Sequence, residues 1–319
     1  MENKGRGTLV TAIVLSLVFV AMGGVAVATV ATNGFTTSVG EAAQTSDQAS
    51  DSGSADASTP ATTEVQDKEA PADPEPETTT TEQTVPSDDE RAAELALDPS
   101  RNTGWNTEHN NGVNTVYLTF DDGPSENTAK ILDILDRYNA KATFFVTGHN
   151  AGYRSSIGDA YRRGHSVGMH TMTHDYSIYD SVDAYFDDLH QVEEVVKEQI
   201  GYVPYLMRFP GGSSNTVSVS HCAGIMTTLT QEVVERGYQY YDWNVSSNDA
   251  AANTVPTETI IEASCVEGYP NVMLLFHDSS PKTTTVEALP TIIEFYQARG
   301  YEFKAIDRSV WVQHHRISN

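Results

Sequence analysis

Short apolar runs alternate with longer amphipathic runs from about Arg101 to the end of the chain. The strand-like runs cover 115–120, 142–147, 205–209, 238–245, 272–278 and 302–307, and the helix-like runs cover 127–140, 182–201, 226–237, 258–268 and 286–300. A repeated strand–helix order is typical of α/β folds with parallel strands. Six or seven such units in 219 residues predict a (β/α) barrel of seven or eight strands, complete or distorted. A doubly wound sheet is the alternative.

Residues 1–32 begin with a short basic segment that leads into a long apolar run. No charged residue occurs from Thr8 to Thr32, and Lys4 and Arg6 lie just before the run. About 20 apolar residues can span a bilayer as a helix, and basic residues before the span keep that side inside the cell. We therefore expect a retained anchor that leaves the remaining chain outside. Cleavage of a signal peptide after Ala28 is the alternative, and it would export the same domain.

Residues 33–100 carry sixteen acidic and two basic side chains and almost no large apolar residue before Leu95. Such a segment cannot bury enough apolar surface to offset its ordering entropy, so we expect a disordered linker. Its Pro, Thr and Glu content and its like charges predict a stiffened spacer. The predicted organisation is an anchor or signal segment (1–32), a linker (33–100) and a folded domain (101–319).

The charge and the cysteine count exclude several classes of protein. A formal net charge of -25 at pH 7 repels phosphate backbones, so we expect no nucleic-acid partner. Two cysteines in the whole chain exclude a disulfide-stapled miniprotein and a CxxC zinc finger. In an exported domain, Cys222 and Cys265 form either a disulfide or two buried thiols.

Polar residues collect where the predicted strands end. They follow or close five separate apolar runs: Asp121 and Asp122, His170, Arg208, Asp242 and Trp243, and His277 and Asp278. Sites in barrels and in open parallel sheets form at the carboxyl edge of the strands. Five clusters at one edge are hard to explain by packing, so we expect a functional site there.

Two histidines and two carboxylates are the candidates for metal binding. His170 and His174 are four residues apart, a spacing that places both imidazoles on one side of a helical turn. With one carboxylate of the Asp121–Asp122 pair they would form a divalent-metal triad with open coordination positions. Taken alone, each motif also fits an ordinary turn or an exposed helix face. Zn²⁺ suits this donor set, and cobalt, manganese or iron are tolerated by it.

The remaining polar residues suit acid–base chemistry. Arg208 lies in an apolar strand and needs a carboxylate partner, for which Asp121 is the candidate. His277 follows an apolar strand, and Asp242 is its candidate orienting partner.

These residues resemble the five ordered motifs of the polysaccharide deacetylases, carbohydrate esterase family 4, also called the NodB homology domain. The motifs are TFDDGP (119–124), HTMTH (170–174), RFPGG (208–212), Tyr241-Asp242-Trp243 and LLFHD (274–278), and the resemblance covers about residues 110–310. It implies a distorted (β/α) barrel and a metal-dependent hydrolysis of N-acetyl groups that releases acetate.

The resemblance also implies a role for each matching residue. Asp121 would be the general base, and Arg208 would orient it. Asp122, His170 and His174 would hold the metal, and the Gly211 N–H would contribute to the oxyanion hole.

The last two motifs supply the acid and the acetyl pocket by the same resemblance. His277 would be the general acid, tuned by Asp242, and Trp243 and Phe276 would line the pocket. The third motif departs from the family pattern, because Gly211 stands where a bulky aromatic often follows the Pro. This change removes a wall of the sugar subsite. By the same resemblance, the presence of Asp122 favours N-acetylglucosamine over N-acetylmuramic acid.

The sequence therefore predicts a membrane-anchored, monomeric, extracellular deacetylase whose partner is a cell-wall polysaccharide, most of all peptidoglycan. One alternative is a secreted enzyme for chitin or acetyl-xylan, which would need no tether. Two others are a non-catalytic glycan-binding module and an amidohydrolase for small cyclic amides.

Overall fold

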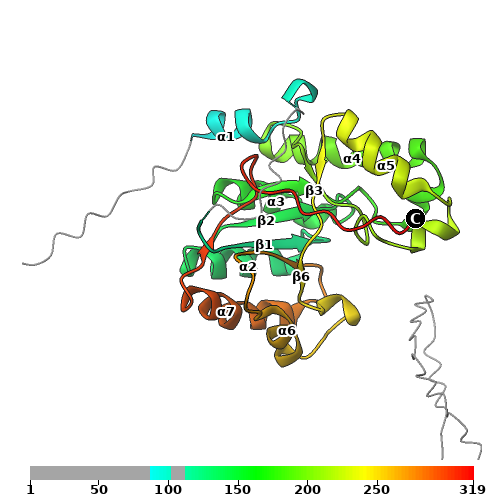
Figure 1. Ribbon diagram of the computed structural model, residues 1–319. Coiled ribbons are helices and arrows are strands. Elements are labelled where there is room, and N and C mark those ends of the chain that lie inside the picture. Colours follow the sequence, from blue (N-terminus) through cyan, green and yellow to red (C-terminus); the bar gives the residue numbers. More distant parts are fainter. Residues whose placement is uncertain (1–86, 102–111) are drawn as a thin grey trace, which may run out of the picture. The chain divides into compact units, whose positions relative to one another are not determined.

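The computed structural model describes residues 87–101 and 112–319, and eight parallel strands form its sheet (Figure 1). The strands are β1 (Thr115–Asp121), β2 (Ala142–Val146), β3 (Ser166–Met169), β4 (Leu206–Met207), β5 (Gln239–Tyr240), β6 (Val245–Ser246), β7 (Asn271–His277) and β8 (Glu302–Phe303). Their order is β5-β4-β3-β2-β1-β7-β6, with β8 paired to β1. The prediction of an α/β fold with parallel strands is confirmed.

Within the described residues, seven helices connect or flank these strands. They are α1 (Asp88–Leu95), α2 (Glu126–Arg137), α3 (Ser155–Arg162), α4 (Val182–Ile200), α5 (Ile225–Glu235), α6 (Thr257–Ser264) and α7 (Thr283–Gln297). Five short 3-10 helices lie among the described loops: η1 (Pro99–Arg101), η2 (Ala151–Tyr153), η3 (Tyr176–Asp180), η4 (Val217–Ser220) and η5 (Asp249–Ala251). Helices α2 and α4 are preceded by the N-cap residues Ser125 and Ser181, whose side chains accept hydrogen bonds from first-turn backbone N–H groups.

The sheet is strongly curled. The run 238–245, predicted as one strand, is two: β5 pairs with β4, and β6 pairs with β7 at the opposite edge of the sheet. From Tyr240 to Val245 the chain takes five steps, which span about 18 Å at most. A flat sheet of seven strands would separate its edges by about 29 Å. The two edges therefore approach each other, and the sheet is a barrel-like parallel sheet that strand pairing does not close.

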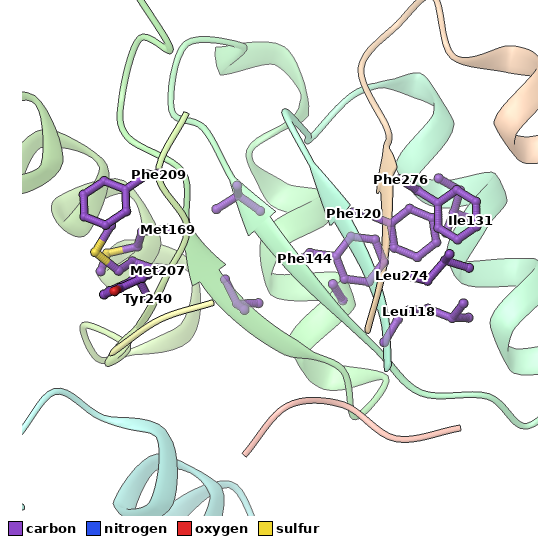
Figure 2. Packing of buried hydrophobic residues seen from close by; sticks show 14 of the residues in the cluster. Leu118, Phe120, Ile131, Phe144, Met169, Met207, Phe209, Tyr240, Leu274 and Phe276 are labelled. Carbon is purple, nitrogen blue, oxygen red and sulfur yellow. The ribbon is translucent and has the colours of Figure 1, made fainter. Parts of the chain in front are cut away.

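Strand alternation divides the buried side chains between two faces. The outer face packs under the helices and includes Val116, Leu118 and Phe120 of β1 with Leu274 and Phe276 of β7 (Figure 2). The inner face holds a second cluster: Leu95, Tyr117, Phe145, Tyr205, Leu206, Tyr241, Met273, Ile306, Val310 and Trp311. This cluster fills the inside of the curl. The polar side chains at the carboxyl ends of the strands therefore lie on closely packed apolar residues.

The linker prediction is wrong for residues 88–95, which form α1. Ser87 and Glu90 form a capping box, and Leu95 is buried in the inner cluster. The Arg91 guanidinium donates to the carbonyls of Tyr161 (2.6 Å) and His165 (2.8 Å). A few anchoring contacts thus order a segment whose composition predicts disorder.

The other predictions for the N-terminal part, the anchor or signal segment and most of the linker, lie outside the described residues. Among the residues that the structure describes, no helix is long and apolar enough to span a membrane. Cys222 and Cys265 are free thiols, so they do not form the disulfide of the first alternative, and each is only partly buried.

Candidate active site

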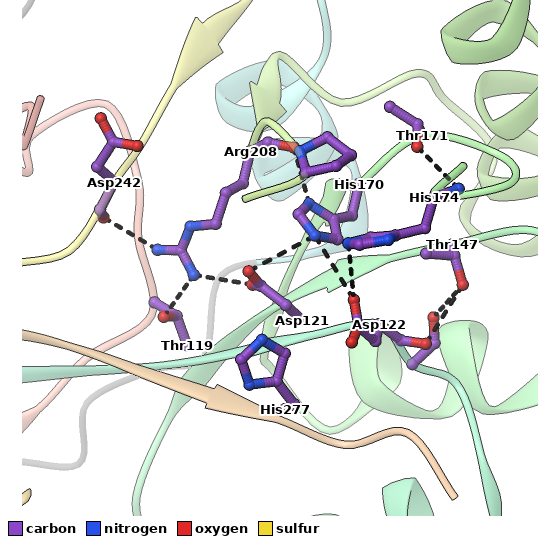
Figure 3. A network of polar contacts seen from close by, with 12 residues as sticks. Thr119, Asp121, Asp122, Thr147, His170, Thr171, His174, Arg208, Asp242 and His277 are labelled. Carbon is purple, nitrogen blue, oxygen red and sulfur yellow. Dashed lines mark hydrogen bonds and ion pairs between the residues drawn. The ribbon is translucent and has the colours of Figure 1, made fainter. Parts of the chain in front are cut away.

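The alternation of β1 and β7 brings the first site residues together. Asp121 is the register partner of His277, and both residues end their strands. Thr119 and Asp121 alternate with Phe120, which packs in the outer core. The Asp121 carboxylate and the His277 ring therefore face the inside of the curl, where Figure 3 shows them on neighbouring strands.

Arg208 joins Asp121 to the neighbouring strands. Its side chain is fully buried and donates to Asp121 Oδ1 (2.8 Å) and to Thr119 Oγ1 (2.8 Å). It also donates to the backbone carbonyls of Tyr241 (2.7 Å) and Asp242 (3.0 Å). Burial raises the pKa of Asp121, while the positive charge of Arg208 opposes that rise. The predicted pairing of Arg208 with Asp121 is present, and it leaves Asp121 Oδ2 unused by the guanidinium.

Below this pair, Arg208 rests on an aromatic ring. Its guanidinium lies 4.3 Å from the centre of the Phe145 ring, a cation–π distance. A Cβ at Gly168 would lie 2.6 Å from that ring, so only glycine leaves room for Phe145 beneath the guanidinium.

Asp122, His170 and His174 converge as the sequence predicts. Asp122 Oδ1 lies 3.6 Å from His170 Nε2 and 3.4 Å from His174 Nε2. The three side chains form the one possible His/Asp metal cluster found among the described residues. Asp122 Oδ1 is buried and has no hydrogen-bond partner within the described part of the chain, as a metal-ligating oxygen would be.

The protonation of His170 also fits metal binding. Its Nδ1 lies 2.8 Å from the Arg208 carbonyl, which selects the tautomer with the proton on Nδ1 and a lone pair on Nε2. Burial, reinforced by the neighbouring His174, lowers the pKa of His170 to about 3. The ring is therefore neutral and ready to act as a ligand. The donor set fits a divalent metal, with coordination positions left open.

The HTMTH segment is not the helical turn that its spacing suggests. Thr171 and His174 have left-handed backbone conformations (φ 67° and 58°), so the segment is a tight loop. Asp188 of α4 holds this loop, because its carboxylate accepts from the backbone N–H groups of Met172 (2.5 Å) and Thr173 (3.2 Å). The prediction that both histidines point the same way is confirmed, but by loop geometry. Sequence reasoning missed Asp188, which carries no motif signal.

The prediction that Asp242 orients His277 is wrong. His277 Nδ1 lies 2.7 Å from Asp249 Oδ1, and its backbone N–H donates to the other oxygen of Asp249 (2.8 Å). Asp249 opens η5, three residues after the end of the two-residue strand β6. Burial acts to lower the pKa of His277, but the hydrogen bond and charge of Asp249 outweigh it and raise that pKa to about 9. His277 is therefore protonated at neutral pH, as a general acid must be.

Asp242 has a different role, since its carboxylate points away from His277 (Figure 3). It accepts from the Ser213 N–H (2.8 Å), from the Ser213 hydroxyl and from the His315 N–H (2.7 Å). These donors belong to the loop after the third motif and to the C-terminal segment. Asp242 therefore joins these two segments beside the site.

The different roles of Asp249 and Asp242 lead to two separable predictions. Asp249→Asn removes the charge that raises the pKa of His277, so the basic limb of the pH–kcat profile is expected to move from about 9 towards the ordinary 6.5. Asp242→Asn is expected to lower Tm and to leave that limb in place. Steady-state rates measured from about pH 5 to about pH 10 check both variants. A shifted limb in Asp242→Asn with none in Asp249→Asn would contradict this assignment.

The three predicted substrate-binding residues are not equally placed. Gly211 is exposed, and a Cβ there would lie 2.9 Å from the Tyr176 hydroxyl, whose ring packs against His174. Trp243 lies against Gly212, where a Cβ would be 2.9 Å from its ring.

Phe276, in contrast, is fully buried and stacks on Phe120 with ring centres 5.5 Å apart. Adjacent residues of a strand point to opposite faces, so Phe276 faces the outer core while His277 faces the site. The prediction that Phe276 lines an acetyl pocket is therefore wrong.

A carboxylate fixed by arginine, a protonated histidine fixed by a second carboxylate and a His–His–Asp cluster together define a hydrolase-type site at the carboxyl edge of a curled parallel sheet. The model of the polysaccharide deacetylase family matches residues 108–227. A peptidoglycan-N-acetylglucosamine deacetylase from Bacillus cereus is 34% identical over 203 residues, covering 60% of this chain and 68% of that relative. The chain belongs to the polysaccharide deacetylase family and is an enzyme of the class that hydrolyses amide bonds.

Two further similarities are to a solved structure and to a second relative. The crystal structure of the catalytic domain of a peptidoglycan N-acetylglucosamine deacetylase from Eubacterium rectale has 44% identity and a TM-score of 0.65, covering 70% of this chain and all (100%) of that chain. A bifunctional xylanase/deacetylase from Pseudobutyrivibrio xylanivorans is 29% identical over 222 residues, covering 66% of this chain and 33% of that relative.

Proposed function

We propose that this enzyme removes N-acetyl groups from N-acetylglucosamine units of peptidoglycan in a metal-dependent hydrolysis. One observation carries the proposal: Asp121, fixed by Arg208 at 2.8 Å, lies beside the Asp122–His170–His174 cluster and opposite the protonated His277. The names of the relatives from Bacillus cereus and Eubacterium rectale support peptidoglycan as the substrate. The resemblance between RFPGG and the third family motif supports Gly211 as an oxyanion contact.

Asp122, His170 and His174 would hold the metal. A bound divalent ion, Zn²⁺ above others, would polarise the acetyl carbonyl and acidify a water molecule. The neutral His170 ring and the unpartnered Asp122 Oδ1 already present the ligand atoms, so little reorganisation is needed.

Asp121 acts as the general base on the attacking water. Its Oδ1 is held by Arg208, and its Oδ2 lies 3.7 Å from His170 Nε2, on the metal side of the site. Oδ2 takes the proton as the water oxygen forms its bond to the carbonyl carbon. Burial, which raises the pKa of Asp121, makes this carboxylate a stronger base than an exposed aspartate.

His277 completes the hydrolysis by protonating the leaving nitrogen. The C–N bond breaks as the nitrogen receives the His277 proton, and the products are acetate and a free amino sugar. Base and acid must hold opposite protonation states, and the separate partners Arg208 and Asp249 maintain this difference. The Gly211 N–H donates to the carbonyl oxygen as negative charge develops on it, a contact of a type worth about 2.7–4 kcal/mol.

We also propose that the domain works outside the cell on a tether. The uncharged run from Thr8 to Thr32 and the acidic segment that follows it support an anchor and a spacer. Release after cleavage near Ala28 is the alternative, and recovery of the domain from the culture medium would favour it.

Acetyl-xylan is the second candidate substrate, because the relative from Pseudobutyrivibrio xylanivorans is named a xylanase/deacetylase. N-Deacetylation releases a primary amine together with acetate, whereas O-deacetylation releases acetate alone. Both products are therefore measured with peptidoglycan, N-acetylglucosamine oligomers and acetyl-xylan in parallel. Equal molar amounts of amine and acetate from the first two substrates support the proposal. Acetate from acetyl-xylan alone would overturn the assignment of peptidoglycan as the substrate.

A further inference from the structure

The Gly211 backbone N–H group lies in the loop after the third motif, and a buried tyrosine fixes its direction. The N–H groups of Gly212 and Ser213 donate to the Phe209 carbonyl (2.8 Å) and to Asp242 (2.8 Å). The Asn215 N–H donates to the Gly212 carbonyl (3.2 Å). The Gly211 N–H has no acceptor among the residues that the structure describes. Unlike the N–H groups of Gly212, Ser213 and Asn215, it is therefore open to a substrate oxygen.

The carbonyl of the same peptide unit is held from inside the protein. The Tyr179 hydroxyl donates to the Pro210 carbonyl oxygen at 2.9 Å, and the Tyr179 side chain is fully buried. In a trans peptide unit the C=O and the following N–H lie in one plane and point in opposite directions. A carbonyl held towards the buried Tyr179 therefore directs the Gly211 N–H the other way, towards the exposed side of the loop.

Tyr179 is joined to the candidate metal site through its own segment. It lies in η3, which begins two residues after His174, and the Tyr176 ring packs against both His174 (5.8 Å) and Tyr179 (6.1 Å). Tyr176 also contacts the Gly211 position. Burial raises the pKa of Tyr179 well above its ordinary value, so the hydroxyl keeps its proton and remains a donor.

We propose that Tyr179 is a positioning residue for the reaction, which sets the Pro210–Gly211 peptide plane so that the Gly211 N–H meets the developing oxyanion. This inference rests on the proposed function. Neither the sequence motifs nor the relatives' names assign a role to Tyr179.

The variant Tyr179→Phe removes one oxygen atom and keeps the ring. A direct oxyanion donor contributes about 10²–10³-fold to kcat, so loss of its support is expected to lower kcat by about 10-fold. KM and metal content are expected to stay near the wild-type values, since the contact strengthens only in the transition state. Acetate release from N-acetylglucosamine oligomers by the full chain measures both constants.

Tyr185→Phe is the matched control. Tyr185 is also fully buried and stacks on Tyr179 (5.9 Å), but its hydroxyl has no partner within the described part of the chain. Loss of that hydroxyl is expected to leave kcat and Tm unchanged or to raise Tm slightly. Equal losses of kcat in both phenylalanine variants would indicate a general packing effect and overturn the proposal.

A second readout separates positioning from structural damage. An N-trifluoroacetyl oligomer carries fluorines that withdraw charge from the oxyanion, so its hydrolysis depends less on a donated hydrogen bond. The kcat defect of Tyr179→Phe is therefore expected to shrink on this substrate by at least about 3-fold. The same defect on both substrates, or wild-type kcat in Tyr179→Phe, would overturn this inference alone. No acetate from the wild-type enzyme would overturn the proposed function and this inference with it.

Discussion

Asp121→Asn is expected to lower kcat by about 10²–10⁴-fold, the usual contribution of a general base. The amide keeps an oxygen that can accept from Arg208, so the fold is expected to persist, but it cannot take a proton from water. Metal content and Tm are expected to stay close to the wild-type values. Acetate release and elemental analysis of the same protein sample measure the two properties.

Asp122→Asn is the matched control for the neighbouring carboxylate. Because Asp122 Oδ1 faces His170 and His174 without another partner, this change is expected to weaken metal binding. Excess metal should then restore part of the activity of Asp122→Asn and none of that of Asp121→Asn. Near wild-type turnover by metal-loaded Asp121→Asn would show that another group is the base.

Arg208→Met is expected to produce the largest loss of stability, about 3–5 kcal/mol in the free energy of unfolding. The substitution leaves the Asp121 carboxylate buried without its cation and removes the donors to two backbone carbonyls. Denaturant unfolding at a constant m-value measures the change. Adding Asp121→Asn to this variant is expected to recover part of the loss, because it removes the uncompensated charge.

Arg299→Met provides the comparison on the surface. Arg299 pairs with the exposed Glu267 at 2.9 Å, and exposed pairs contribute about 0–1 kcal/mol. If Arg208→Met were no more destabilising than Arg299→Met, the ion pair with Asp121 would not organise the site.

Most of the site could be predicted from sequence because its residues follow recognisable strands. Asp121 and His277 end the two longest strands, so their apolar runs mark the sheet edge clearly. Asp249 was missed because the strand before it, Val245–Ser246, is too short to leave an apolar signal. Asp242 is the more visible candidate in the sequence, because it lies in the longer apolar run 238–245.

Other errors have simple physical reasons. Phe276 precedes His277 on a strand, and the two-residue alternation alone places it on the opposite face. The HTMTH spacing fits a helix, but Asp188, from a helix later in the chain, stabilises a loop instead. Tyr179 has no sequence signal, because its role depends on the carbonyl of Pro210, 31 residues later.

Asp122, His170 and His174 are proposed to hold a metal that N-deacetylation requires. The most direct test of this proposal is acetate release from N-acetylglucosamine oligomers by chelator-treated enzyme during titration with Zn²⁺. We predict that activity is lost on chelation and returns in proportion to added Zn²⁺ until about one ion is bound per chain. Full activity in the chelator-treated, metal-free enzyme would contradict the proposal.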